Sequence, residues 1–309
     1  MAVLAWIGER ARWVMPGGIV LGMLAPELSG LLRPVLPALL CLVLGLSMAR
    51  LDLREAVEAA VGRALPLLAL CGLLMPGWAL LLWIAGAALP PEWRALLVYT
   101  AMAPPIASAA GLAFMMGLNA RLALELTVLA TLLTPALGPL VIALLLEPAP
   151  SLAPSVLAGR LFLTLLGGVL LALAIRRFAG PARIAAAGTR FDGAVALAMA
   201  AFFVSLFDGF GPALIQDPLR GLYLSLLVIA LNTGLAIGVA ALSRRISAPN
   251  AAGALGLVAG NRTVALYVAV LPADPLLSLY TALYQIPMSL TPLLRRLLQG
   301  PKPPAPRPR

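Results

Sequence analysis

The sequence predicts an all-α membrane protein with ten transmembrane helices, arranged as two inverted repeats of five. Three observations lead to this prediction. The 309 residues are 62% hydrophobic and 11% charged, whereas a soluble domain carries about 25% charged residues. Long apolar runs recur along the chain and lack the short alternation of an outer-membrane barrel. Basic residues gather in alternate loops, which gives each span a direction.

The first inverted repeat is expected over residues 1–147. A lead-in with Glu9 and Arg10 precedes the first span, and Pro90 and Pro91 end the third. Prolines and basic loops delimit the other spans in the same way. The five expected spans are 13–28, 35–51, 64–89, 94–117 and 121–146.

The second inverted repeat is expected over residues 148–297, after a polar, proline-rich link near the centre of the chain. The remaining residues, 298–309, form a basic, proline-rich tail that is expected to be disordered and cytoplasmic. The five expected spans of this half are 155–175, 192–207, 219–242, 249–271 and 275–294.

The distribution of Lys and Arg indicates the orientation, because cytoplasmic loops carry an excess of both residues. Most of the 22 basic residues fall on one side of the ten expected spans. Both termini are therefore expected in the cytoplasm, and two halves of five spans must then have opposite orientations. The few loop residues on the other side are Arg33, Arg94, Arg160 and Arg220.

The fourth and ninth expected spans are interrupted, at 104–108 and at 260–262. An arginine at mid-membrane depth costs about 2.5–3.5 kcal/mol on insertion scales, so it indicates a binding or conduction site. Interrupted spans at corresponding places in two halves are typical of a secondary transporter's substrate site. We therefore expect substrate to bind Arg262, Asn261 and Thr263, and to gain charge stabilisation from the adjoining helix N-termini.

Polar residues in other spans are further candidates. Ser108 in the fourth span, Asn232 in the eighth and Tyr284 in the tenth are expected to contribute to substrate binding. Glu125 is an acid well inside an apolar span, and it is a candidate for proton coupling. Two other interpretations of Glu125 stay open: an ion pair with Arg262, or a carboxylate that reaches the cytoplasmic surface.

The composition argues against other classes of function. The chain has no histidine and no Gly-x-Ser-x-Gly motif, so an intramembrane enzyme is not expected. It has no P-loop, so ATP does not drive it through this chain. Its net charge of +10 lies in short loops between spans, which indicates a lipid bilayer and not nucleic acid as the partner. No cofactor and no metal site are expected.

Three stretches resemble the bile acid:sodium symporter family. They are VLGLSMARLDLREAV at 43–57, APPIASAAGLAFMMGLNARLALELTVLATLLTPALGPLV at 103–141, and GNRTVALYVAVLP at 260–272. The resemblance implies a bacterial member of the family in the inner membrane. It also implies a panel domain and a core domain that give alternating access to a small or amphipathic organic anion.

The chain departs from that family at the positions of the sodium ligands. The corresponding positions here are Ala109, Ala110, Ala123, Thr127, Leu257 and Asn261. Only Thr127 and Asn261 keep a side-chain oxygen, and a hard cation needs several oxygen ligands. We therefore expect altered or absent sodium coupling, with Arg262 in place of the cations. Sodium-coupled symport and a receptor or scaffold without transport remain the alternatives.

Overall fold

The computed structural model describes residues 2–50, 62–146 and 152–299. Within these ranges the chain is helical and contains no named strand. Six helical stretches in the described part are long and apolar enough to cross a membrane. This agrees with the expected class, an all-α membrane protein. The six are Pro26–Ala49, Ala64–Ala85, Ala120–Leu145, Pro154–Ala179, Thr189–Gln216 and Pro218–Ser243.

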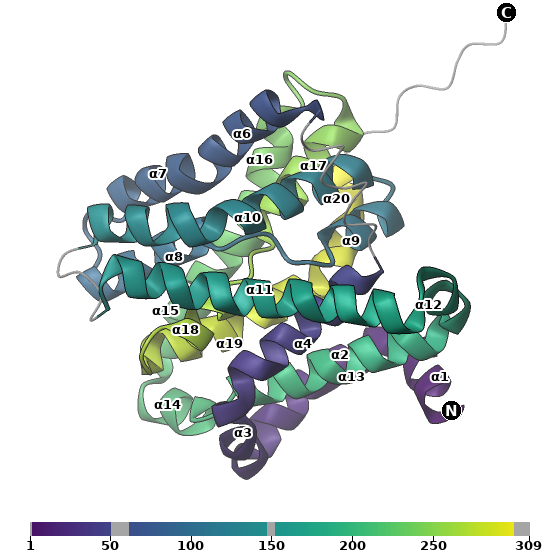
Figure 1. Cartoon of the computed structure of the whole chain (residues 1–309). Coiled ribbons are helices and arrows are strands. Elements are labelled where there is room, and N and C mark those ends of the chain that lie inside the picture. The colour runs from purple at the N-terminus through teal and green to yellow at the C-terminus, as the bar shows by residue number, and fades with distance from the viewer. Residues whose placement is uncertain (1, 51–61, 147–151, 300–309) are drawn as a thin grey trace, which may run out of the picture.

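The helices follow one another closely along the chain (Figure 1). Those of the first half are α1 (Ala2–Glu9), α2 (Ala11–Leu24), α3 (Pro26–Leu32), α4 (Leu36–Ala49), α6 (Ala64–Gly72), α7 (Trp78–Ala85), α8 (Pro91–Met102), α9 (Ala109–Met115) and α10 (Ala120–Leu145). Those of the second half are α11 (Pro154–Ala179), α12 (Pro181–Ala187), α13 (Thr189–Leu206), α14 (Phe210–Gln216), α15 (Pro218–Ile229), α16 (Leu235–Ser243), α17 (Pro249–Gly260), α18 (Ala265–Val270), α19 (Pro275–Leu290) and α20 (Arg295–Gln299).

The order of elements from α6 to α10 is repeated from α15 to α19. Each series starts with two helices joined by a five-residue π-helical segment, Leu73–Gly77 in the first and Ala230–Gly234 in the second. A 12-residue helix follows in both series, then an interruption and a short helix. The last helix of each series has an N-cap side chain, Asn119 for α10 and Asp274 for α19. The same pattern of interruptions therefore occurs twice.

The helices form two groups in space (Figure 1). One group contains α1 to α4 with α11 and α13, and the other contains α6 to α9 with α15 to α17 and α20. Helices α10 and α19 contact members of both groups, whereas α18, which follows α17 in the chain, contacts α4 and α11 of the first group. The interruption between α17 and α18 therefore lies where the two groups meet.

Close contact between α16 and α17 depends on two glycines. A Cβ atom at Gly256 would lie 2.2 Å from the Ala236 carbonyl oxygen, and one at Gly260 would lie 2.2 Å from the Asn232 carbonyl oxygen. Neither space admits a larger side chain, so the two helices touch backbone to backbone. Such contacts replace the missing hydrophobic driving force between helices in lipid.

Some boundaries differ from those expected. The lead-in forms α1, which packs against α13 through a close contact of Gly8 with Thr189. The second span already begins at Pro26, because a 3₁₀ turn carries the helix past Pro34. At the other end α20 runs to Gln299, two residues into the expected tail. The rest of that tail, the central link at 147–151 and the polar connection at 51–61 lie outside the described residues.

We expect Gly256→Ala to lower the free energy of unfolding by about 2 kcal/mol, because the new methyl group forces α16 and α17 apart. Gly238→Ala on α16 is the matched control, since a Cβ there meets nothing within 4 Å. It should leave stability unchanged or raise it by up to about 1 kcal/mol. Thermal unfolding of the detergent-solubilised protein, followed by circular dichroism, checks both. Equal shifts for the two variants would contradict the described contact.

Candidate functional site

The two interrupted regions meet each other. Pro105, between α8 and α9, forms an antiparallel bridge with Arg262, between α17 and α18. The Thr263 amide donates to the Pro104 carbonyl at 2.8 Å, and the Ile106 amide donates to the Asn261 carbonyl at 3.0 Å. The two prolines end α8 because they lack amide hydrogens and disfavour helix before them. The expected meeting of the two interruptions is therefore present, and we refer to residues 103–108 and 261–264 as the crossing.

The guanidinium of Arg262 is buried in the crossing and bonded to backbone carbonyls. The whole residue is only 2% exposed. Nε donates to Ala259 at 3.0 Å, Nη1 to Ala103 at 3.1 Å and Nη2 to Leu74 at 2.6 Å. The three acceptors belong to three different parts of the chain, so one side chain ties them together.

Each of these carbonyls has lost its normal helical partner. Ala103 follows the last residue of α8 in an extended conformation. The usual donor to Ala259 would be the Thr263 amide, which bonds to Pro104 instead. The usual helical donor to the Leu74 carbonyl would be the Trp78 amide, which bonds to the carbonyls of residues 73 and 75 instead. Helix ends carry partial negative charge at such carbonyls, so they suit a cation.

Three other polar residues donate hydrogen bonds to Gly260 and Asn261, at the start of the second interruption. Asn232 donates from Nδ2 to the Gly260 carbonyl at 2.8 Å, and the Tyr284 hydroxyl donates to the same oxygen at 2.6 Å. Thr291 donates to Oδ1 of Asn261 at 2.7 Å. The side chains of Asn232, Tyr284 and Asn261 are buried and do not line the pocket described next. Their place is structural support of the crossing.

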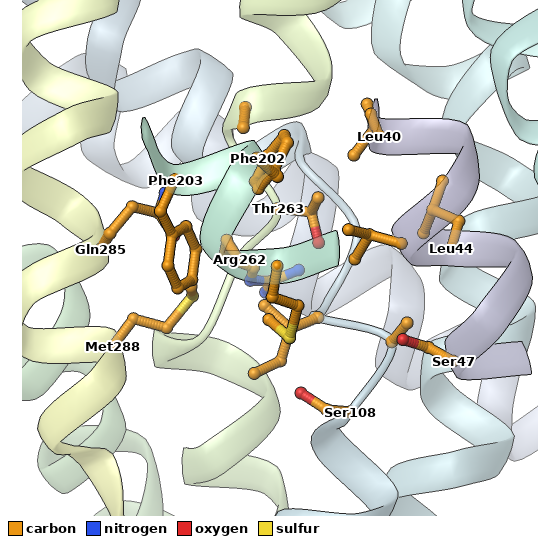
Figure 2. A pocket seen from close by; sticks show the side chains of 15 residues that line it. Leu40, Leu44, Ser47, Ser108, Phe202, Phe203, Arg262, Thr263, Gln285 and Met288 are labelled. Carbon is orange, nitrogen blue, oxygen red and sulfur yellow. The ribbon is translucent and has the colours of Figure 1, made fainter. Parts of the chain in front are cut away.

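A pocket lies between the crossing and helices α4, α13 and α19 (Figure 2). The pocket is partly open to the outside, and its space together with the solvent at its open side is about 470 Å³. In Figure 2, Leu40, Leu44 and Ser47 of α4 face Gln285 and Met288 of α19 across Arg262 and Thr263. The aromatic rings of α13 close another side. The pocket therefore contacts both groups of helices.

Three of the expected substrate-binding residues line this pocket: Arg262, Thr263 and Ser108. Ser108 is exposed and stands directly before α9, but its hydroxyl makes no capping bond to that helix. Thr263 is half-buried and donates to the Pro105 carbonyl at 3.3 Å. The helices that restart at the crossing, α9 and α18, have only seven and six residues. Their dipoles are therefore short, and the main positive charge at the pocket is the guanidinium.

The positions that the resemblance would assign to sodium ligands contribute few oxygen atoms. Ala109, Ala110, Ala123 and Leu257 are buried and apolar. The Thr127 hydroxyl donates to the Ala123 carbonyl at 2.7 Å, within its own helix. Within the described ranges, no group of three or more His, Cys, Asp or Glu residues is arranged to hold a metal ion.

Glu125 is buried near the start of α10 and pairs with two arginines. Its carboxylate accepts from Nε of Arg121 at 2.8 Å and from Nη1 of Arg63 at 3.0 Å. The Glu125 side chain is 1% exposed, whereas those of Arg121 and Arg63 are 69% and 50% exposed. These ion pairs join α10 to the residue before α6. The hydrogen-bond partners of Arg262 are carbonyls, so the interpretation of a Glu125–Arg262 ion pair is wrong.

Sequence reasoning missed two parts of the site. The first is the contribution of the third span, whose Leu74 carbonyl accepts from Arg262. Pro76 inside that apolar run was a usable signal, because proline disturbs the helical bonding around it. The second is Gln285, which lines the pocket although its sequence context is that of an ordinary polar residue in an apolar helix.

No protein-family model and no curated protein matches the chain.

We expect Arg262→Met to lower the free energy of unfolding by at least about 3 kcal/mol, because three buried carbonyls lose their donor. Arg262→Lys keeps the charge but has one nitrogen, which cannot span three acceptors, so it should fall between Met and the wild type. Arg220→Met, at an exposed arginine, is the control and should change stability by less than about 0.5 kcal/mol. Chemical unfolding in detergent measures all three. An Arg262→Met protein of wild-type stability would show that the carbonyls find other donors.

We expect Glu125→Gln to cost about 2 kcal/mol of stability, because two charge-assisted hydrogen bonds to a buried carboxylate are weakened. Asp192→Asn is the matched control. Asp192 pairs with Arg50 at 2.6 Å, but both side chains are about two-fifths exposed, at 41% and 39%. An exposed pair contributes at most about 1 kcal/mol. The same unfolding assay compares the variants, and a larger loss for Asp192→Asn would reverse this ranking.

Proposed function

We propose that this chain is a secondary transporter of a small or amphipathic organic anion, related in mechanism to the bile acid:sodium symporter family. The observation that carries the proposal is the antiparallel meeting of two interrupted helices beside a pocket with a guanidinium in its wall. Unwound backbone in a membrane protein is tolerated only where protein or water surrounds it. Such backbone next to a cavity is the usual design of a transporter's substrate site.

The repeated order of elements supports an inverted repeat. Ten spans result when α2, α19, the α8–α9 pair and the α17–α18 pair are added to the six long helices. The series α6–α10 and α15–α19 then occupy equivalent places in two halves of five spans. Because five is odd, the halves would face opposite sides of the membrane. We propose this topology, with both termini in the cytoplasm and the bacterial inner membrane as the location.

The position of the pocket suggests how access alternates. Helices α4 and α13 supply one wall, and the crossing with α19 supplies the other. The first two belong to one group of packed helices, and the crossing is built from the other group. Movement of one group relative to the other would open the pocket to one side and close it to the other. Such a movement would correspond to the panel-and-core arrangement that the resemblance implies.

Arg262 would supply the electrostatic role of bound cations in this proposal. A guanidinium has five donor hydrogens, and three of them are used by the backbone carbonyls. Its charge lies at the pocket wall, where low dielectric strengthens attraction for an anion. Because it is covalently fixed, it holds the crossing together without a sodium ion. The Thr127 hydroxyl, which bonds within its own helix, supports the same view.

We expect proteoliposomes to take up cholate, an amphipathic organic anion, at a rate that does not change when an inward sodium gradient is replaced by a potassium gradient. Ala107→Trp should reduce uptake at least about tenfold, because the indole fills the pocket that Ala107 lines. Leu132→Trp, on an exposed apolar position of α10, is the control and should retain uptake.

Other results would select the alternatives. Uptake that rises several-fold with the sodium gradient would indicate symport of the kind found in the family. Cholate binding without uptake would indicate a receptor or scaffold. Equal uptake by the Ala107→Trp and Leu132→Trp proteins would place the transport route elsewhere.

A further inference from the structure

Two arginine side chains join the two walls of the pocket at one of its ends. Arg33, in the 3₁₀ turn before α4, donates from Nη2 to the Ser278 hydroxyl of α19 at 2.8 Å. Arg160 of α11 donates from Nη1 to the Val270 carbonyl, at the end of α18, at 2.9 Å. Each bond therefore connects the first group of helices with α19 or with the helix that follows the crossing.

The pocket is closed at this end and open at the other. Ser278 precedes Gln285, which lines the pocket, by seven residues of α19, or about 10 Å along the helix. At the opposite end of the pocket Ser108 is exposed and Ser47 is half-buried. In Figure 2 these two serines lie at the end of the pocket away from Leu40. The neighbours of the arginine end are almost completely buried, among them Leu36, Phe207 and Leu277.

The closed end lies on the side of the chain that carries few basic residues. Arg33 and Arg160 belong to the four loop arginines of that side. On the proposed topology this side faces away from the cytoplasm, so the pocket is open towards the cytoplasm. For the opposite end to open, the bond between Arg33 and Ser278 has to break. Arg33 then needs another partner, since an unpaired charge is costly at such a place.

The hydrogen bonding of Arg33 is incomplete in the closed position. Its Nη2 donates to a neutral hydroxyl, and its Nη1 is buried without a partner among the described residues. A guanidinium pairs most strongly with a carboxylate, to which it can donate from two nitrogens at once. Ser278 therefore uses only part of the bonding capacity of this side chain.

A carboxylate lies beside Arg33 within the first group of helices. Asp208 follows α13 and is exposed. A Cβ atom at Gly30 would lie 3.4 Å from its Oδ1, and Gly30 is one turn before Arg33 on the same helical stretch. The charge of Asp208 attracts that of Arg33. Because Asp208 does not belong to α19, it stays beside Arg33 when α19 moves away.

We propose that Arg33 is a two-position latch at the outer end of the pocket. Bonded to Ser278, it holds this end closed; bonded to Asp208, it stabilises the state in which this end is open. Arg160 adds a bond to the closed position. The inference rests on the proposed function, because it assigns residues to the alternation of access. Breaking one bond and forming another keeps the two states close in free energy, as transport in both directions requires.

The test measures the separation of the two groups at the outer end by double electron–electron resonance. Spin labels are attached to Val35→Cys, before α4, and Leu89→Cys, between α7 and α8, because both positions are exposed. Cys41→Ala and Cys71→Ala remove the native thiols. In lipid nanodiscs this full-length protein should show a main short distance and a minor longer one.

Ser278→Ala should raise the ratio of the longer to the shorter distance about tenfold, because the closed position loses a hydrogen bond from a charged donor. Asp208→Asn, added to Ser278→Ala, should lower that ratio again, because the open position loses its carboxylate. In a protein with Arg33→Met, neither substitution should change the ratio by more than about twofold, since the residue that couples them is gone.

Two matched controls act on the same side of the chain. Ser225→Ala removes a serine hydroxyl that bonds within its own helix, to the Gly221 carbonyl at 2.8 Å. Asp217→Asn neutralises an exposed acid that caps α15, and asparagine caps equally well. Both controls should leave the distance distribution unchanged.

Three results would overturn the latch. One is an unchanged distribution in Ser278→Ala, and another is a ratio that Asp208→Asn leaves unchanged or raises. The third is an undiminished effect of both substitutions in the Arg33→Met protein. If that protein does not fold, the opposite effects of the other two substitutions still decide. Cholate uptake by the same proteins separates the two proposals. With uptake present the proposed function stands without the latch, and with neither uptake nor a second distance in any variant both fall.

Discussion

The structure depends on the guanidinium of Arg262, which donates to three carbonyls that lack their usual helical donors. The interruptions at the crossing and the π-helical segment each release a backbone oxygen inside an apolar environment, where an unpaired oxygen is costly. Arg262 donates to all three. The oxygens in turn stabilise a charge that would be unfavourable in lipid. Neither the irregular backbone nor the buried arginine is stable alone, and each makes the other possible.

Other helix ends near the crossing are held by the same kind of contact. Arg160 donates to the Val270 carbonyl at 2.9 Å, at the end of α18, and Gln299 donates to the Met116 carbonyl at 2.5 Å, after α9. These side chains come from α11 and α20 and satisfy the last carbonyls of two very short helices. The short helices therefore keep their place through side chains of distant helices and not through their own length.

Much of the fold follows from patterns that are local in sequence. Apolar runs, prolines at helix starts and loop arginines place the helices to within a few residues, and Pro104 with Pro105 marks one interruption. The interior of the site does not follow in the same way. In sequence, Asn261, Asn232 and Tyr284 look like ligands. In the structure they donate to backbone carbonyls of α17, directly before residues 261–264 of the crossing. Which polar side chain faces a cavity depends on helix rotation, and nearly uniform apolar spans carry little information about rotation.

The positions of the three acceptors along the chain have a consequence for synthesis. Leu74, Ala103 and Ala259 all precede Arg262, the first of them by 188 residues. Chains leave the ribosome from the N-terminus, so the segments that receive the guanidinium are made before it. When the arginine enters the bilayer, the carbonyls that accept its hydrogen bonds have therefore already been synthesised. Its charge need not stay unpaired in hydrocarbon until a later segment is made. A truncation or reordering that placed these segments after the arginine would remove that advantage during biogenesis, even if the final contacts were the same.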